Sequence, residues 1–429
     1  MFTKVRTVAV GLAVLATAVS LFVLALAVWL PNDDDLAGQL STRAEDALGV
    51  KVSVGSVHWS LFPKPVVTIN DFRTQQAHPV VIGKLRVYPS LTMLLHRKLV
   101  LDRVEVEDST VPRNSLHALR VKAGVANQYS QAGLPLAHVA FRNITWISYS
   151  GIATTYDGDI DFDAQWRPRY AQVRRPGVTP PFTLTLTRDA EEDRWQMRIL
   201  VGGGTADGKF VLKTAEDGAM HLTGHLAPRD VEVASGVSAF NRRSPVSGKA
   251  SGETDVSAEG KTVGELTRSL HTRTQFTVSS AIFLRFDLDK AIRTFGKEHE
   301  GQTPLQELTG QLDTQNGPEG MRVTGTDIRG RAGKFTATGK GTVYHGQIEA
   351  TANVDLVEGA VGVPVTLSGS VHKPKVSVPP GVVAGAAIGT VVLPVIGTAI
   401  GARIGGAVGK LFNGGAQKSR SQQKETVPK

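Results

Sequence analysis

Hydrophobic and polar residues alternate along most of this chain. Between Gln347 and Leu356, every second residue is apolar and the intervening residues are polar. The stretch from Lys51 to Leu61 alternates in the same way, with a change of phase at Gly55 that indicates a bulge. Because successive side chains of a strand point to opposite faces, this pattern predicts strands with one apolar and one polar face.

Less regular runs of the same kind predict further strands at residues 66–72, 80–87, 99–106, 141–149, 160–166, 182–187, 195–201, 210–214 and 221–226. Helical periodicity predicts an amphipathic helix over Asp35–Leu48 and a single helical turn over Leu91–Leu95. Capping residues predict short helices after Thr262 and Asp287. The proline-rich residues 167–181 are predicted to form a loop.

About 18 such strands, spaced roughly 4.8 Å apart, would extend about 85 Å if they were stacked in one direction. Twist would curl a sheet of that length, and the few predicted helices cannot cover its apolar face. The sequence therefore predicts a mainly β fold, in which a long curled antiparallel sheet carries an apolar groove. A pair of ordinary β-sandwiches is the alternative that the pattern leaves open.

The N-terminal segment Val8–Leu30 is apolar and carries no charge. A membrane-spanning helix needs roughly 20 apolar residues, whereas the apolar region of a signal peptide usually has about 7–15. We therefore favour an uncleaved anchor over a signal peptide. Lys4 and Arg6 precede the segment, so the positive-inside rule places the rest of the chain across the membrane.

A second uncharged segment lies near the C-terminus, where glycines recur at every fourth position between Gly381 and Gly409. Glycines at this spacing allow two helices to approach closely in lipid. Residues 381–413 are therefore predicted to enter a membrane as a helix or hairpin kinked at Pro394, with an apolar tail packed on the sheet as the alternative. The predicted packing positions are Gly385, Gly389, Gly397, Gly401 and Gly405. Residues 414–429 are predicted to be a disordered basic tail.

The composition excludes several classes of function. The chain has no cysteine, which excludes disulfides, thiolate metal sites and cysteine catalysis. Its net charge of +9 is spread along the sequence, without the basic clusters of nucleic-acid-binding proteins. His221 and His225 are four residues apart, but no third metal ligand lies near them in sequence. We predict no catalytic, metal or cofactor site, and an exported hydrolase is the least favoured alternative.

Two parts of the sequence resemble the AsmA family. Residues 40–63 read LSTRAEDALGVKVSVGSVHWSLFP, and residues 94–104 read LLHRKLVLDRV. In the second half, AEGKT at 258–262, FDL at 286–288 and VTLSGS at 365–370 follow in the order and spacing of the family. The resemblance covers roughly residues 1–110 and 240–378. It divides the chain into an anchor (1–30), an amphipathic helix (31–49), an N-terminal β region (50–240) and a C-terminal β region (241–380).

The resemblance implies an inner-membrane protein with one N-terminal anchor and its bulk in the periplasm, related to bridge-like lipid-transfer proteins. It implies a curled sheet that passes phospholipids between membranes and supports outer-membrane biogenesis, without catalytic residues. The implied partners are phospholipids, the inner membrane, and outer-membrane or envelope assembly proteins, with no nucleic acid. A non-enzymatic scaffold for outer-membrane protein assembly is the alternative.

The alternating apolar residues are predicted to line the groove, although each is equally suited to an ordinary core. The predicted lining residues are Val57, Trp59, Leu61, Val67, Ile69, Val104, Val106, Ile348, Ala350 and Val354.

Overall fold

The computed structural model describes residues 33–60, 64–90, 100–117, 136–148, 150–163, 167–189, 193–261, 263–317, 320–333, 335–356, 362–371 and 373–379. The chain divides into two compact units, Met1–Pro379 and Pro380–Lys429, and every described residue belongs to the first. The predicted anchor, the glycine ladder and the predicted turn at 91–95 lie outside the described residues. None of the described helices has both the length and the hydropathy of a bilayer span.

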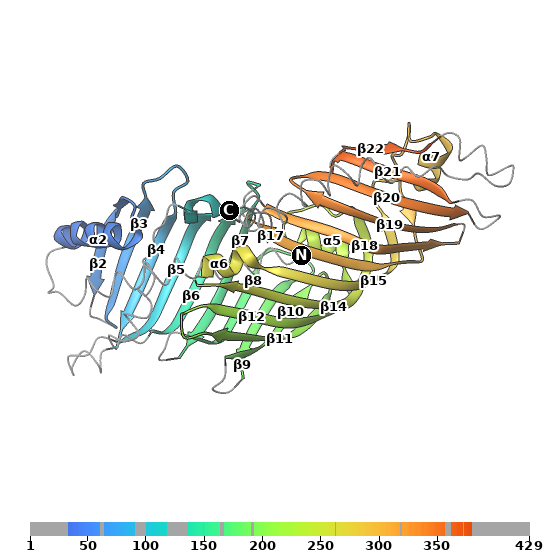
Figure 1. Ribbon diagram of the computed structural model, residues 1–429. Helices are drawn as coiled ribbons and strands as arrows, with labels where there is room; N and C mark the ends of the chain where they lie inside the picture. Colours follow the sequence, from blue (N-terminus) through green and yellow to red (C-terminus); the bar gives the residue numbers. More distant parts are fainter. Residues whose placement is uncertain are drawn as a thin grey trace, which may run out of the picture. The chain divides into compact units, whose positions relative to one another are not determined.

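The fold is mainly β, as predicted, and its 22 described strands form one sheet (Figure 1). The first eleven strands are β1 (Val52–Ser53), β2 (Ser56–Ser60), β3 (Val66–Thr74), β4 (Val81–Pro89), β5 (Leu101–Pro112), β6 (Leu136–Ile147), β7 (Ala153–Phe162), β8 (Pro168–Arg175), β9 (Phe182–Arg188), β10 (Arg194–Val201) and β11 (Gly204–Thr214). The others are β12 (Met220–Arg229), β13 (Val231–Glu232), β14 (Val246–Gly260), β15 (His271–Phe283), β16 (Thr303–Pro304), β17 (Glu307–Gly317), β18 (Gly320–Ala332), β19 (Phe335–Tyr344), β20 (Gln347–Leu356), β21 (Val363–Ser370) and β22 (Lys373–Ser377).

Neighbours in sequence are neighbours in the sheet. β1 and β2 both pair with β3, and the ladder then runs strand by strand to β22, with the short β13 and β16 extending the lines of β12 and β17. No described pairing joins β22 to β1 or β2, so the sheet is not closed into a barrel. The described strands form one hydrogen-bonded sheet, so the alternative of two separate β-sandwiches is wrong for this part of the chain.

One pair departs from the predicted antiparallel order. β5 and β6 are parallel, with Val104 opposite Val139 and Val106 opposite Phe141. Parallel neighbours need a crossover connection of a dozen or more residues, and residues 113–135 supply it. The sequence pattern of two adjacent strands does not record their relative direction, which is why the alternation could not predict this exception.

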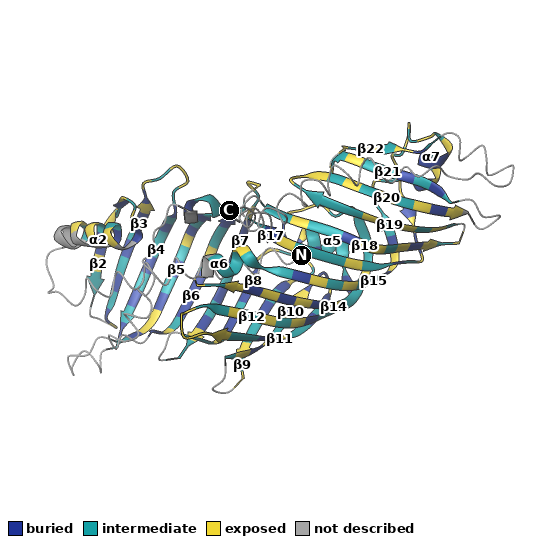
Figure 2. Cartoon of the chain, viewed as in Figure 1, coloured by how far each residue is buried: buried dark blue, intermediate teal, exposed yellow. Residues whose placement is uncertain are grey.

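The predicted division into an apolar and a polar face is present along the strands. In β20, Ile348, Ala350 and Ala352 are partly buried and Val354 is fully buried, whereas the intervening residues are exposed. The same alternation gives the banded burial pattern of Figure 2. On the apolar face, one continuous cluster of buried side chains extends from α2 (Asp33–Leu48) to Val256 in β14, and a smaller cluster surrounds Val278 in β15.

Residues with a left-handed backbone lie side by side in neighbouring strands, where the phase of each strand changes at the same place. Asp71 in β3 and Asp108 in β5 have positive φ values of 54° and 53°. A Cβ on Gly55 would lie 2.9 Å from the Cβ of Asp71, and a Cβ on Gly83 would lie 2.8 Å from the carbonyl oxygen of Asp108. The line continues into β6, where the side-chain amide of Asn143 donates to Asp108 Oδ1 at 2.6 Å. Glycine is therefore required opposite these left-handed residues. The predicted change of phase at Gly55 is present, but the pairing register on its two sides is the same, so it is not a bulge with an extra residue.

The three predicted helices are present. They are α2, α6 (Val263–Ser269) and α7 (Leu288–Arg293), and Asp287 caps α7 by accepting a hydrogen bond from the backbone N–H of Lys290 at 2.9 Å. The sequence did not predict α5 (Val233–Ser238) or the 3₁₀-helix η1 (Arg113–His117). α5 is too short to show helical periodicity, and its capping residue is a glutamate rather than one of the residues preferred at that position.

The prediction for residues 160–181 is wrong. Residues 160–162 end β7, which begins at Ala153, and the predicted proline-rich loop contains β8. β8 is obscured in the sequence because arginines occupy both of its faces. Arg174 is exposed on the polar face, and Arg175 is buried on the apolar face.

Glu232 holds the start of α5 against β14. Its carboxylate accepts hydrogen bonds from the backbone N–H groups of Ala234 at 3.1 Å, Gly248 at 3.2 Å and Ser235. Burial alone would raise the pKa of this carboxyl, but the hydrogen bonds outweigh burial and hold the pKa below its usual value. The ionised carboxylate therefore stabilises the junction between β13 and β14.

We expect Glu232→Gln to lower the stability of the fold by about 1 kcal/mol at neutral pH, as for the loss of a helix cap. Because the folded pKa is depressed, the contribution is present above the unfolded pKa near 4.5 and is lost as the pH falls through the folded pKa. Thermal unfolding followed by circular dichroism should show a difference from the wild type that disappears in acid. Glu253→Gln, on an exposed carboxylate, is the control, and a difference that persists in acid would contradict this role.

Candidate functional site

One row of directly opposed residues crosses the sheet on its apolar face, and we call it the axial row. Each member is the cross-strand partner of the next. From β2 to β22 the row consists of Trp59, Val67, Val87, Val104, Val139, Ile160, Ala171, Leu186, Met197, Gly208, Leu226, Thr254, Thr274, Leu312, Gly325, Gly341, Ala350, Leu367 and Val376. No member carries a charge. The apolar face is therefore continuous across every strand-to-strand junction along this line.

The two polar members of the axial row satisfy each other. Thr254 and Thr274 are directly opposed, and their hydroxyl oxygens lie 3.0 Å apart. A hydroxyl whose hydrogen bond is made within the sheet presents mainly its methyl group to a neighbour, so this pair interrupts the apolar line little. The pair therefore adds no unpaired polar group to the axial row.

Burial changes along the axial row. Val87 and Val104, near its start, are 0% exposed, and Ile160 is 1% exposed. Leu312, Ala350 and the later members Leu367 and Val376 are only partly buried. The row is thus covered over β3–β8 and, except at the buried Gly325, partly accessible over β17–β22, so the second part is where apolar material from solution can reach the sheet.

The opposite face carries paired charges. Arg86 in β4 contacts Glu105 at 3.3 Å and Glu107 at 2.8 Å in β5, and the guanidinium of Arg198 contacts Asp207 at 2.6 Å across β10 and β11. Exposed ion pairs contribute little to stability, but charges that are favourable on the polar face would be strongly unfavourable on the apolar one. They help to specify which face of each strand meets water.

The structure places the predicted lining residues on the apolar face. The fully buried ones are Val57, Val67, Ile69, Val104, Val106 and Val354, and the partly buried ones are Trp59, Ile348 and Ala350. Leu61 lies outside the described residues, as do Gly385, Gly389, Gly397, Gly401 and Gly405. Trp59, Val67, Val104 and Ala350 belong to the axial row, and Val57, Ile69 and Val106 belong to the adjacent row. The alternation therefore assigned these residues to the same surface from strands far apart in sequence.

Two arginines on the apolar face were not predicted. Arg188, at the end of β9, has a side chain that is 4% exposed and donates to Asp163 and, at 3.0 Å, to Asp193. Its guanidinium carbon also lies 5.8 Å from the centre of the Trp195 ring. Arg175, in β8, is equally buried but lacks a carboxylate partner among the described residues. The alternation of β8 could have revealed Arg175, because residues 171, 173 and 175 share one face of the strand and Ala171 and Val173 are apolar.

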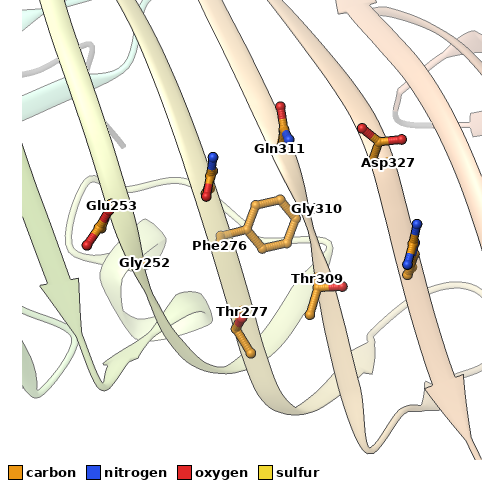
Figure 3. Close-up of a pocket in the computed structure, with 10 residues that line it drawn as sticks. Gly252, Glu253, Phe276, Thr277, Thr309, Gly310, Gln311 and Asp327 are labelled. Carbon is orange, nitrogen blue, oxygen red and sulfur yellow. The ribbon is translucent and has the colours of Figure 1, made fainter.

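A hollow of about 390 Å³ lies among β14, β15, β17 and β18 (Figure 3). Gly252 and Gly310 lie opposite Phe276 on its two sides, and a Cβ on Gly310 would come within 3.3 Å of the Phe276 ring. The other lining groups are mainly polar and include Glu253 and Asp327. The hollow has too little apolar lining to hold an acyl chain by itself, so it does not replace the axial row as the candidate site.

His221 and His225 do not share a metal site. His221 and His225 lie on the polar face, where they face different carboxylates, Glu259 at 3.8 Å and Asp255 at 3.0 Å. In the described ranges, no three metal-ligating side chains come together. These histidines therefore belong to the paired charges of the polar face.

No family model, curated protein or solved structure matches this chain. The resemblance to the AsmA family therefore stays a prediction, and the argument for function depends on the geometry of the two faces.

The Arg188 cluster gives a prediction about stability. Arg188→Met would leave Asp163 and Asp193 with less compensating charge at a partly buried site, and we expect a loss on the order of 3 kcal/mol. Arg198→Met, which removes an exposed partner of Asp207, should change stability little. Denaturant unfolding of both variants measures the difference. Equal effects of the two substitutions would show that the Arg188 cluster does not hold this end of the sheet.

Proposed function

We propose that this chain is an AsmA-like, non-enzymatic lipid carrier, anchored in the inner membrane by residues 8–30 with its sheet in the periplasm. Acyl chains pass along the apolar face while the polar face stays in water. The observation that carries this proposal is the axial row, which continues without a charged residue from Trp59 to Val376. At about 4.8 Å per strand, the row follows the sheet for roughly 85 Å.

The energetics of hydrocarbon support this use of the apolar face. Each methylene that leaves water gains about 0.8 kcal/mol, so an acyl chain does not cross an aqueous gap without an apolar path. A single charged residue in the row would interrupt such a path, because a charge in contact with hydrocarbon loses its hydration. The accessible stretch from Leu312 to Val376 gives acyl chains a place to enter or leave.

The edge strand β22 supports the carrier over the scaffold. A scaffold that binds clients by strand addition needs a free edge with unblocked backbone groups. β22 carries Lys373, Pro374 and Lys375, and charged residues and proline are the usual means of preventing edge pairing. The role in outer-membrane biogenesis, with outer-membrane or envelope assembly proteins as partners, is then a consequence of lipid supply.

Ala350→Asp tests the path directly. Ala350 belongs to the axial row and is partly buried, so a carboxylate there would place a charge against the acyl chain. The full-length variant is purified in mild detergent. We expect it to copurify with at most about one tenth of the phospholipid found with the wild type, because a buried unpaired charge costs more than 1.4 kcal/mol. Mass spectrometry of the extracted lipid gives the measurement.

Thr351→Asp is the matched control, because Thr351 is the next residue in β20 and is exposed on the polar face. This variant should bind as much phospholipid as the wild type, and circular dichroism should show that both variants are folded. A folded Ala350→Asp variant with undiminished lipid would contradict the proposed path. A wild-type chain that copurifies with no lipid would contradict the carrier function itself.

A further inference from the structure

Four buried polar side chains gather on the apolar face at one end of β6, β7 and β8. Trp146, Thr154, Tyr156 and Arg175 are 5%, 2%, 4% and 8% exposed. The Trp146 indole N–H and Nη1 of Arg175 make no hydrogen bond with any described residue, and the Thr154 and Tyr156 hydroxyls have no described partner beyond each other. Buried polar groups are normally hydrogen-bonded, so two unpaired donors beside a pair of hydroxyls on an otherwise apolar surface need an explanation.

The strand register brings these four residues together. Trp146 is the cross-strand partner of Thr154, and Tyr156 follows two residues later on the same face of β7. Arg175 in β8 is next to Tyr156, with its guanidinium carbon 5.7 Å from the centre of the Tyr156 ring. Neighbouring positions on one face of a sheet are about 5–7 Å apart. The four polar groups therefore form a patch that one small ligand can span.

Arg175 gives the patch a positive charge that no carboxylate in the described part of the chain balances. Its Nε donates to the carbonyl oxygen of Thr155 at 3.3 Å, but no carboxylate of the described residues pairs with it. Arg188, at the other end of β9, shows how the same face normally holds a buried arginine, with two aspartates. Burial accordingly lowers the pKa of Arg175 and raises that of Tyr156. The patch is therefore suited to an anion supplied from outside the chain.

The chemistry of the four side chains limits the class of ligand that they can bind. An indole N–H and a guanidinium can only donate hydrogen bonds, and hydroxyls can donate as well. The guanidinium fork matches the paired oxygens of a phosphate or carboxylate. The row that contains Tyr156 continues through Ile144 on one side, and Phe182, which stacks edge-on against Phe240 at 5.1 Å, lies beyond Arg175 on the other. An oxyanion held here has hydrocarbon on both sides.

We propose that Trp146, Thr154, Tyr156 and Arg175 bind the oxyanion of an acidic amphiphile, a phosphate or carboxylate joined to a hydrocarbon chain. This inference rests on the proposed lipid carriage and adds a preference for acidic lipids over zwitterionic ones. A second cation lies near the patch, since Arg242 donates to Ser150 at 3.1 Å and Asn241 donates to the carbonyl oxygen of Ala153, the residue before Thr154. Arg242 is exposed and attracts anions towards this end of the strands.

Photocrosslinking in vesicles tests the preference. The full chain is reconstituted in vesicles of equal phosphatidylglycerol and phosphatidylcholine, each with the same photoreactive group on its acyl chain. We expect crosslinks in residues 136–188 to favour phosphatidylglycerol about tenfold. Both headgroups offer phosphate oxygens, but only phosphatidylcholine brings a quaternary ammonium beside the Arg175 guanidinium, and a like-charge contact on the order of 1.4 kcal/mol gives this factor. Arg175→Gln should reduce this ratio to about one, and Arg175→Lys, which keeps the charge but not the fork, should lie between.

Arg174→Gln is the matched control. Arg174 precedes Arg175 in β8 and is exposed on the polar face, 3.9 Å from Asp159. The Arg174→Gln substitution makes the same chemical change one residue away. This variant should keep the wild-type ratio of phosphatidylglycerol to phosphatidylcholine crosslinks. An unchanged ratio in folded Arg175→Gln would overturn the inference. Crosslinks elsewhere on the apolar face without any preference would overturn it too, while leaving the lipid carrier intact.

Inorganic phosphate separates a lipid headgroup from a free anion. If the patch serves free phosphate, phosphate should raise the Tm of the wild type but not of Arg175→Gln, and no lipid preference should be seen. That result would support the oxyanion site with a soluble source and would leave the lipid carrier to the Ala350→Asp experiment. If phosphate has no effect and no acidic lipid is preferred, the oxyanion site is excluded.

A measurement of stability distinguishes binding from a structural role. A buried, unbalanced guanidinium is unfavourable in the lipid-free chain, so Arg175→Met should raise the Tm of delipidated protein. If Arg175 instead stabilises β8 through Tyr156 and Thr155, the same substitution should lower the Tm. Arg188→Met, by contrast, should lower the Tm, because Arg188 has carboxylate partners in Asp163 and Asp193. A loss of stability in Arg175→Met would therefore contradict the proposed site.

Discussion

Strand register is the constraint on which the separation of the two faces depends. A slip of one residue in any pairing would turn every side chain of the following strand to the other face. Each pairing from Trp59 to Val376 keeps an uncharged residue opposite an uncharged one. The same register places charged partners such as Arg86 and Glu105, and Arg198 and Asp207, directly opposite each other. The burial of apolar residues and the pairing of charged ones therefore select the same register.

A line of left-handed residues shows how the two faces stay separate where the phase of the strands changes. A change of phase in one strand would mix the faces unless the neighbouring strands changed phase at the same place. Asp71, Asp108 and Asn143 take left-handed conformations in strands that lie side by side, and Gly55 and Gly83 leave room for two of them. Asp and Asn tolerate this conformation better than other residues with a Cβ. The strands therefore change phase together, and the two faces are not mixed.

Much of this arrangement follows from the sequence, because burial in a one-sided sheet has a period of two that can be counted. The alternation predicted β20 and the surface shared by Val57, Val104 and Ala350. It failed at β8, where two consecutive arginines conceal the period, and at the parallel pair β5–β6, whose direction leaves no trace in the pattern. The Trp146–Arg175 patch could not be predicted, since it depends on which strands are neighbours.

Arg175 and Arg188 show that the apolar face treats charge in two ways. Arg188 is balanced by Asp163 and Asp193, so its charge is a structural element and has no need of a ligand. Arg175 is left unbalanced, which costs stability, and such a cost is typical of binding sites rather than of cores. A uniform row of apolar residues lets hydrocarbon move with little preference for any position, because each strand offers the same kind of surface. In the proposed site, a single cation without a described carboxylate partner lies beside that row and supplies a preferred position for the oxyanion of an acidic lipid. Selectivity on such a surface requires only that one charge lack its usual partner.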